Sequence, residues 1–369
     1  MSRSALRPLG ELLASKAGPV SLLPSRAFST SQSHALRATF SETENPELNA
    51  TLKEIQEKIV FPGYLPTEQK ERVFDVKNRS VLEKNPVILE LDDIEYKFPP
   101  LNVMKDIPNS KKIYRDAIKQ MKTPQDWDNF AVLLAGYKKA SIKLKPSDYA
   151  LAARRAAGTG NITAILECIK QEDKTGFPLE LESAHRMLHV INQSKILESS
   201  GAKSQTTQAS KWCETLLDLD ARRVGGKGYH QVAFAPLFSG MVLFNKLCAV
   251  KVGHIDASIA ADQVRLVKSI WDRVDRDPGN FKKGPYNDNY KKLPGIPYVV
   301  SMYMHAEMDG QVLRAISLAK ELGIEEAGSL AFIEDILDTW VPTKAAPGAE
   351  QQYKEKVEIT RNLPLDGTA

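Results

Sequence analysis

The chain has 369 residues, of which 42% are hydrophobic and 26% are charged. This length suffices for a large core or several stacked units, and the mean hydropathy of −0.32 excludes a membrane bundle. Three cysteines, Cys168, Cys213 and Cys248, stand far apart without a CxxC pair. They predict reduced, buried thiols and exclude a disulfide framework or a cysteine zinc site.

Residues 1–40 differ from the rest in charge. They hold five basic residues and one acidic residue and are rich in Ser, Ala and Leu, a composition typical of mitochondrial transit peptides. Arg26-Ala27-Phe28 before Ser29 resembles a matrix-processing site of the fungal style. We predict a transit peptide at 1–40 and a location in the mitochondrial matrix. A merely basic, disordered tail is the alternative.

Removal of this segment changes the charge balance. The full chain has 50 basic and 46 acidic residues, and subtracting five basic and one acidic residue leaves 45 of each. Nucleic-acid binders usually carry a basic excess, because neutralising phosphates supplies much of their affinity. A neutral mature chain therefore favours a protein partner, although a local basic patch is enough for RNA.

Residues 41–107 predict an irregular, extended N-terminal arm. A short helix follows Asn45-Pro46, with apolar residues on one face. Residues 87–91 and 94–98 predict a small β-hairpin, and Pro99-Pro100 enforces extended chain after it.

From residue 108 to 342 the apolar spacing is helical. Single helices are predicted at 109–121, 123–137, 180–198, around Trp212, at 236–250, 255–276 and 330–340. The polar stretch 198–210 predicts a loop, 277–297 a linker, and 343–369 a tail with one short charged helix. The apolar stretch 232–250 is too short and interrupted for a membrane span, so no transmembrane segment is predicted.

Two further segments predict helical hairpins. Lys145–Phe177 predicts two antiparallel helices around a turn at Gly158–Asn161. Tyr298–Met308 and Gln311–Leu322 predict a second hairpin, turned at Asp309-Gly310. One hairpin cannot bury both its faces, so it needs similar neighbours. The predicted fold class is all-α: an α-solenoid of stacked hairpins over 108–342.

The segment 145–177, with its Ala-Ala-Gly turn and closing Gly-Phe-Pro, resembles a pentatricopeptide repeat. The segment 297–325, with its Met-Asp-Gly turn and closing Gly-Ile-Glu, also resembles a pentatricopeptide repeat. Tetratricopeptide and generic α-solenoid repeats have similar patterns. The resemblance implies a concave binding groove and, for organellar members, a role at RNA or the mitochondrial ribosome. It also places Asp148 at a position that affects base choice. Two regular units are too few to read a base series, and degenerate repeats are more often protein-binding scaffolds.

Five basic residues are candidates for contact with RNA or another partner. Arg154 and Arg155, in the first helix of 145–177, either face the groove and bind the RNA backbone or are simply solvated. Arg222, Arg223 and Lys227 belong to a glycine-dense loop. Such a loop either binds phosphate through arginines and free N–H groups or is flexible and solvated.

No catalytic, metal-binding or cofactor-binding residue is predicted. Gly226-Lys227 lacks the other residues of a phosphate-binding P-loop. Glu182, His185 and His189 share one helical face, but no fourth ligand is suitably spaced.

The sequence thus predicts a non-catalytic mitochondrial helical-repeat protein that acts in organellar gene expression by binding RNA or the mitochondrial ribosome. The alternative is a scaffold or assembly factor for a respiratory-chain complex, peripheral to the inner membrane. A continuous basic groove would favour the first function, and scattered charge beside an apolar groove would favour the second.

Overall fold

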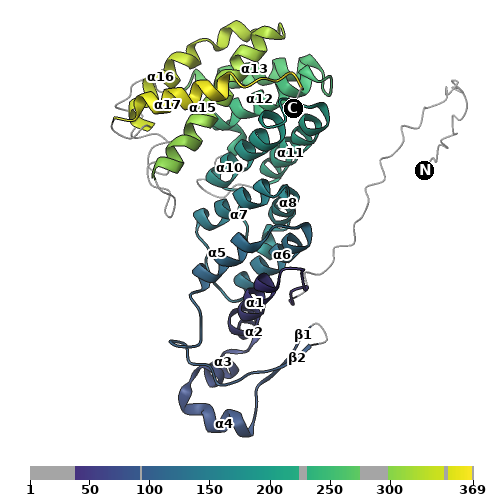
Figure 1. Cartoon of the computed structure of the whole chain (residues 1–369), viewed down its shortest axis with the longest axis vertical. Coiled ribbons are helices and arrows are strands. Elements are labelled where there is room, and N and C mark those ends of the chain that lie inside the picture. Colours follow the sequence, from purple (N-terminus) through teal and green to yellow (C-terminus); the bar gives the residue numbers. More distant parts are fainter. Residues whose placement is uncertain (1–37, 92–93, 224–230, 275–297, 345–347, 368–369) are drawn as a thin grey trace, which may run out of the picture. The chain divides into compact units, whose positions relative to one another are not determined.

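The computed structural model describes residues 38–91, 94–223, 231–274, 298–344 and 348–367, all within one compact unit, Leu36–Ala369. These residues are mostly helical, with one two-stranded ribbon (Figure 1). The predicted all-α helical-repeat fold is confirmed. The predicted transit peptide lies outside the described residues except at 38–40, and the predicted linker at 277–297 lies wholly outside them.

The first elements divide between two hydrophobic cores. They are α1 (Pro46–Ile55), the π-turn η1 (Gln56–Val60), α2 (Phe61–Tyr64), α3 (Thr67–Phe74), the 3-10 turn η2 (Val76–Asn78), α4 (Arg79–Lys84), β1 (Ile88–Leu91) and β2 (Ile94–Lys97). Helix α1 packs against the next helix, α5, and its apolar face joins the main core. The ribbon and α2–α4 surround a second, smaller core that includes Phe61, Val73 and Phe98. The predicted β-hairpin is confirmed, with Leu89 opposite Tyr96.

The next helices alternate between two rows. They are α5 (Ser110–Gln120), α6 (Pro124–Lys139), α7 (Pro146–Gly158), α8 (Ile162–Lys170), α9 (Glu172–Thr175), α10 (Leu181–Asn192), its π-helical extension η3 (Gln193–Leu197) and α11 (Lys203–Arg222). Helices α5, α7 and α10 contact one another in series, and so do α6, α8 and α11 (Figure 1). This alternation is what stacked hairpins produce. The hairpin predicted at 145–177 is confirmed as α7 and α8.

The last elements enclose the most apolar helix. They are η4 (Val232–Phe234), α12 (Pro236–Lys251), α13 (Ala257–Trp271), α15 (Tyr298–Glu321), η5 (Ala327–Leu330), α16 (Phe332–Lys344) and α17 (Glu350–Arg361). Helix α12 begins at Pro236, as predicted, and contacts α10, α11, α13 and α15. Neighbours on all sides explain why it is apolar around its whole circumference. Among the described residues, no helix is both long and apolar enough to cross a membrane.

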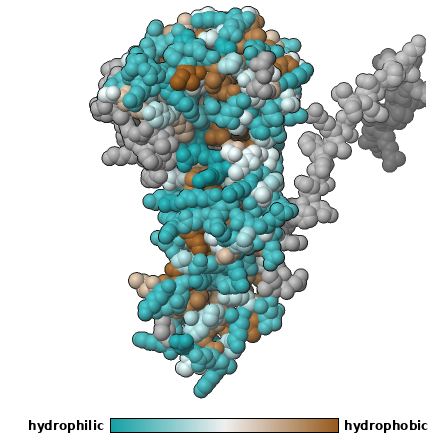
Figure 2. Space-filling view, in the orientation of Figure 1, coloured by the Kyte–Doolittle hydropathy of each residue, from teal (hydrophilic) through white to brown (hydrophobic). Residues whose placement is uncertain are grey.

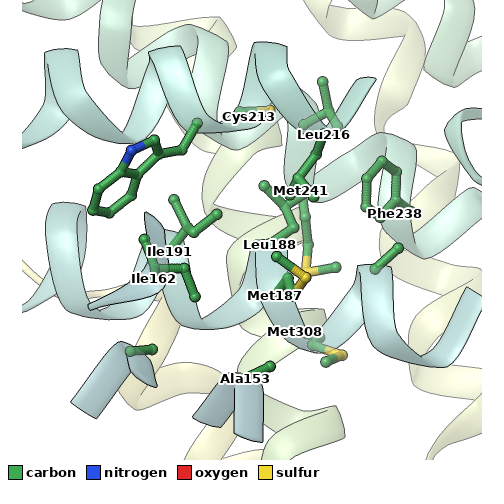
Figure 3. Close-up of a cluster of buried hydrophobic side chains, with 14 of the residues drawn as sticks. Ala153, Ile162, Met187, Leu188, Ile191, Cys213, Leu216, Phe238, Met241 and Met308 are labelled. Carbon is green, nitrogen blue, oxygen red and sulfur yellow. The ribbon is translucent and has the colours of Figure 1, made fainter. Parts of the chain in front are cut away.

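The main core is continuous across the helix pairs. Figure 3 shows buried side chains from several helices converging, with Ala153 on α7, Ile162 on α8, Leu188 on α10, Cys213 on α11 and Met241 on α12. The core surrounds small residues on α7, where Ala152, Ala153 and Ala156 are fully buried. The face visible in Figure 2 is mostly hydrophilic, with apolar side chains in separate patches.

Two predictions about local structure are wrong. The stretch 198–210 is a turn only as far as Ala202, because α11 begins at Lys203 and buries Thr206, Ala209 and Ser210. These small side chains pack closely but give no apolar periodicity to read. The segment 298–322 is not a hairpin, because α15 runs unbroken from Tyr298 to Glu321.

Candidate functional site

Helix ends and the loops beside them are bonded to one another along one edge, where α6, α7 and α9 meet. Lys138 Nζ donates to the carbonyl oxygens of Glu172, at 3.3 Å, and of Asp173. The Tyr149 hydroxyl donates to the carbonyl of Gly176 at 2.9 Å. We call residues 138–145, 171–180 and 222–223 the connecting-loop edge. Its loops come from different helix pairs but form one bonded surface.

Four lysines gather on this edge. Lys138, Lys139, Lys143 and Lys145 lie close together in the sequence, and all four are exposed. In the part of the chain that the structure describes, none of them forms an ion pair with a carboxylate. The charge of Lys138 does act on the Glu172 carboxylate at longer range and favours its ionised form. Lys138 is bonded to two backbone carbonyls, and no carboxylate of the described residues is paired with the charges of Lys139, Lys143 and Lys145.

The loop that carries these lysines has a defined conformation. Ser141 adopts a left-handed backbone with φ of 60°, and the Ile142 N–H donates to the Tyr137 carbonyl at 2.9 Å. Beyond this turn, Ile142 and Leu144 are half-buried against the main core, whereas Lys143 and Lys145 are exposed. Because alternate residues of an extended chain point the same way, the core contacts turn both lysines outward.

A groove of about 450 Å³ lies beside the lysines. Its walls include Tyr137 and Tyr149 from α6 and α7 and Thr175 from α9. Burial, with smaller effects of Glu180, Asp148 and Glu172, raises the pKa of Tyr149 to about 12. The tyrosine therefore stays neutral and remains a hydrogen-bond donor to the Gly176 carbonyl.

The predicted site residue Asp148 is buried and already engaged. Its side chain is 1% exposed and forms an ion pair with Arg115, with Nε and Oδ1 2.8 Å apart. Its other oxygen accepts the Lys145 N–H at 3.0 Å, in the arrangement that caps a helix start. The prediction that Asp148 contacts a partner is untested, but these contacts give it a structural role at the start of α7.

Arg154 and Arg155 lie at the other end of α7, about 10 Å further along the helix axis at 1.5 Å per residue. Arg155 is exposed and Arg154 is half-buried. Burial and the neighbouring Arg155 lower the pKa of Arg154. The fold therefore does not bring these arginines together with the connecting-loop edge, and their binding to a partner stays a prediction.

The predicted basic loop lies partly within the edge. Arg222 pairs with Asp218 one turn earlier on α11, with Nη2 and Oδ2 2.7 Å apart. Arg223 donates to the Leu179 carbonyl and pairs with Glu172 at 3.1 Å, so it bonds α11 to the loop before α10. Lys227 lies outside the described residues. Binding by any of the three remains a prediction.

The lysines at 138–145 were missed at the sequence level. Their signal is the interval 129–147, which contains four lysines and no acidic residue. It is easily overlooked because the whole chain is rich in charges of both signs, and only the fold shows which charges are paired.

The two histidines of the predicted shared face are buried and contact groups within the fold. His185 Nδ1 lies 2.7 Å from the Leu181 carbonyl, and burial lowers the pKa of His185 to about 4 although this hydrogen bond opposes it. His189 Nε2 lies 3.1 Å from Glu307 of α15. Within the described ranges no group of three His, Cys, Asp or Glu residues is placed to hold a metal ion.

The stacked helix pairs and the basic edge define an all-α helical-repeat protein that presents a charged surface from its connecting loops. The family described as "Mitochondrial ribosomal protein mS27" matches residues 26–357, and the chain belongs to this family. A relative from Neurospora crassa, "Small ribosomal subunit protein mS27", is 32% identical over 181 residues, which is 49% of this chain and 46% of the relative. The match thus spans about half the length of that relative. The predicted location in the mitochondrial matrix is confirmed.

Proposed function

We propose that this chain is a non-catalytic component of the small subunit of the mitochondrial ribosome and acts in mitochondrial translation by binding the ribosome. The observation that carries the proposal is the family match over residues 26–357. The name of the Neurospora crassa relative agrees with it. A helical-repeat fold suits a binding protein, since stacked helices offer extended surfaces.

The finer predictions from the repeat resemblance receive unequal support. The unit at 145–177 is a helical hairpin, as a pentatricopeptide repeat would be. The unit at 297–325 is one continuous helix over most of its length. A series of base-reading repeats therefore has little support, and RNA binding rests on charge instead.

Co-sedimentation tests the proposal. The chain, tagged at its C-terminus in its own organism, should migrate with the small ribosomal subunit when a mitochondrial lysate is separated on a sucrose gradient. Depletion of the chain should lower synthesis of all mitochondrially encoded polypeptides, measured by labelled methionine with cytosolic translation blocked. Sedimentation apart from the small subunit, with normal translation, would contradict the proposal.

The alternative function, a respiratory-complex scaffold, gains no support from the family. The same lysate separates the two functions on a native gel. A scaffold would migrate with a respiratory complex, and its depletion would reduce that complex before it reduced translation.

A further inference from the structure

We propose that the connecting-loop edge binds the phosphate backbone of RNA, with Lys139, Lys143 and Lys145 as its phosphate contacts. This deepens the proposed function and rests on it, because a ribosomal subunit is where the chain would meet RNA. None of these lysines is among the candidate residues that the repeat resemblance suggested, such as Asp148.

Unpaired charge is the first argument. Several exposed lysines elsewhere have a carboxylate one helical turn away, as in Lys53–Glu57, Lys119–Asp116 and Lys170–Glu167. The three edge lysines have no such partner in the part of the chain described. The whole edge holds seven basic and three acidic residues, in a chain with 45 of each after position 40, and this local excess attracts an anion.

Preorganisation is the second argument. Lys138, in the last turn of α6, fixes the start of the loop to α9 through the carbonyls of Glu172 and Asp173. Lys139 lies 5.2 Å from the centre of the Tyr64 ring, and Lys143 and Lys145 point outward from a backbone held by its apolar neighbours. A surface ordered before binding loses less conformational entropy when it binds.

The composition of the edge favours RNA over protein. Lysine is depleted in the cores of protein interfaces. The two tyrosines of the groove are buried or half-buried, and the hydroxyl of Tyr149 is already bonded to the Gly176 carbonyl. None of the exposed large hydrophobic residues in the described chain lies in 138–145 or 171–180. Phosphate groups, in contrast, are contacted by lysines without any apolar requirement.

The test measures salt dependence. The full chain binds a fluorescent transcript of the small-subunit mitochondrial ribosomal RNA at KCl concentrations of about 50 to 300 mM. Each phosphate contact adds roughly one to the slope of log affinity against log salt. The variant Lys139→Gln/Lys143→Gln/Lys145→Gln should lose about 2 to 3 in this slope and bind at least about 10-fold more weakly near 100 mM salt.

A matched control removes three exposed lysines that have carboxylate partners, as Lys53→Gln/Lys119→Gln/Lys354→Gln. Its slope should equal that of the unmodified chain. Circular dichroism then checks that both variants are folded. An RNA of shuffled sequence should show the same loss in the edge variant, because phosphate contacts do not read bases.

Three results would overturn one proposal or the other. An unchanged slope in the edge variant overturns RNA binding by this edge. No RNA binding by a chain that still migrates with the small subunit overturns it as well, leaving a protein as the partner of these lysines. Absence of the unmodified chain from the small-subunit fractions overturns the proposed function instead, whatever the slope.

Discussion

Asp148 shows how the surroundings of a single residue separate a structural role from a binding role. A polar residue in the first turn of a repeat helix suits either role at the sequence level. In the fold its carboxylate forms an ion pair with Arg115 and accepts the Lys145 N–H, and only 1% of its side chain is exposed. The ion pair with Arg115 of α5 holds α7 against α5. The second oxygen caps the start of α7, so both oxygens are bonded within the protein.

Replacement of Asp148 should therefore destabilise the protein. Asp148→Ala removes a helix cap and a charge-assisted hydrogen bond, which together contribute about 2 to 3 kcal/mol. The midpoint of urea unfolding should fall accordingly, while affinity for RNA in the folded protein stays within about twofold of its original value. Asp116→Ala, which removes an exposed pair with Lys119, should change stability by less than about 0.5 kcal/mol. If Asp148→Ala had normal stability but no longer bound RNA, Asp148 would instead be a contact with the partner.

Arg222 and Arg223 show how much of the role of a single residue the sequence could predict. Their density with glycine indicated a basic loop, and the structure does place Arg223 beside the loop before α10. Its guanidinium is used for a carbonyl and a carboxylate. Charge type is visible in a sequence, but the pairing of a charge depends on residues far along the chain, as with Arg223 and Glu172.

At the scale of elements, α15 explains why a turn motif can lie within a helix. Asp309-Gly310 resembles a hairpin turn because both residues favour turns. Here the Asp309 carboxylate accepts the Tyr353 hydroxyl of α17 at 2.7 Å. A Cβ on Gly310 would lie 2.6 Å from Thr360 Cβ, so glycine permits the close approach of α17. The residues of the supposed turn are those that α17 requires, and this helix lies far along the chain.

Helices α10, α15 and α17 also share an ionic contact that should make stability depend on pH. Glu307 of α15 lies 3.1 Å from His189 of α10 and 2.8 Å from Lys356 of α17. Burial alone would raise the pKa of Glu307, but hydrogen bonds and charges from His189 and Lys356 outweigh it and lower the pKa to about 2. A folded-state pKa below the unfolded value of 4.5 means that the ionised form stabilises the fold.

This stabilisation should be complete above about pH 5 and should disappear as the pH falls toward 2. Glu307→Gln should cost about 2 kcal/mol at neutral pH and should make the loss of stability between about pH 5 and about pH 2.5 less steep. Urea unfolding at several pH values measures both effects. The control variant Glu358→Gln changes an exposed position of α17. Its stability should depend on pH in the same way as that of the unmodified chain. Equal profiles for the Glu307 variant and the unmodified chain would contradict this account.

At the scale of the whole molecule, the helical class and most helix positions could be predicted, because apolar spacing and N-terminal caps are local. Asn109 and Thr123 cap α5 and α6 where the sequence indicated helix starts. The extent of the core could not be predicted. Helix α17 was expected as a short charged helix in a tail, yet its Tyr353 and Val357 join the main core, since burial of a sparse apolar face depends on the partner helix.

All three cysteines belong to this one core cluster, on α8, α11 and α12. Burial raises the pKa of each thiol, to about 12 for Cys213 and Cys248 and further for Cys168. Because the thiolate is the reactive form, the native protein should react with a thiol reagent at about pH 8 at least about a thousandfold more slowly than the unfolded chain.

The continuity of the core also predicts when the three thiols become reactive during unfolding. If the stacked helices unfold together, Cys168, Cys213 and Cys248 should become reactive at the same urea concentration, resolved by pulsed alkylation and peptide mass spectrometry. A chain with Ser258→Cys, at an exposed position of α13, supplies a thiol that reacts before unfolding and calibrates the pulse. Repeat proteins whose units contact only their neighbours can lose an end first. Earlier exposure of Cys168 than of Cys248 would show that the helix pairs near α8 unfold separately from those around α12.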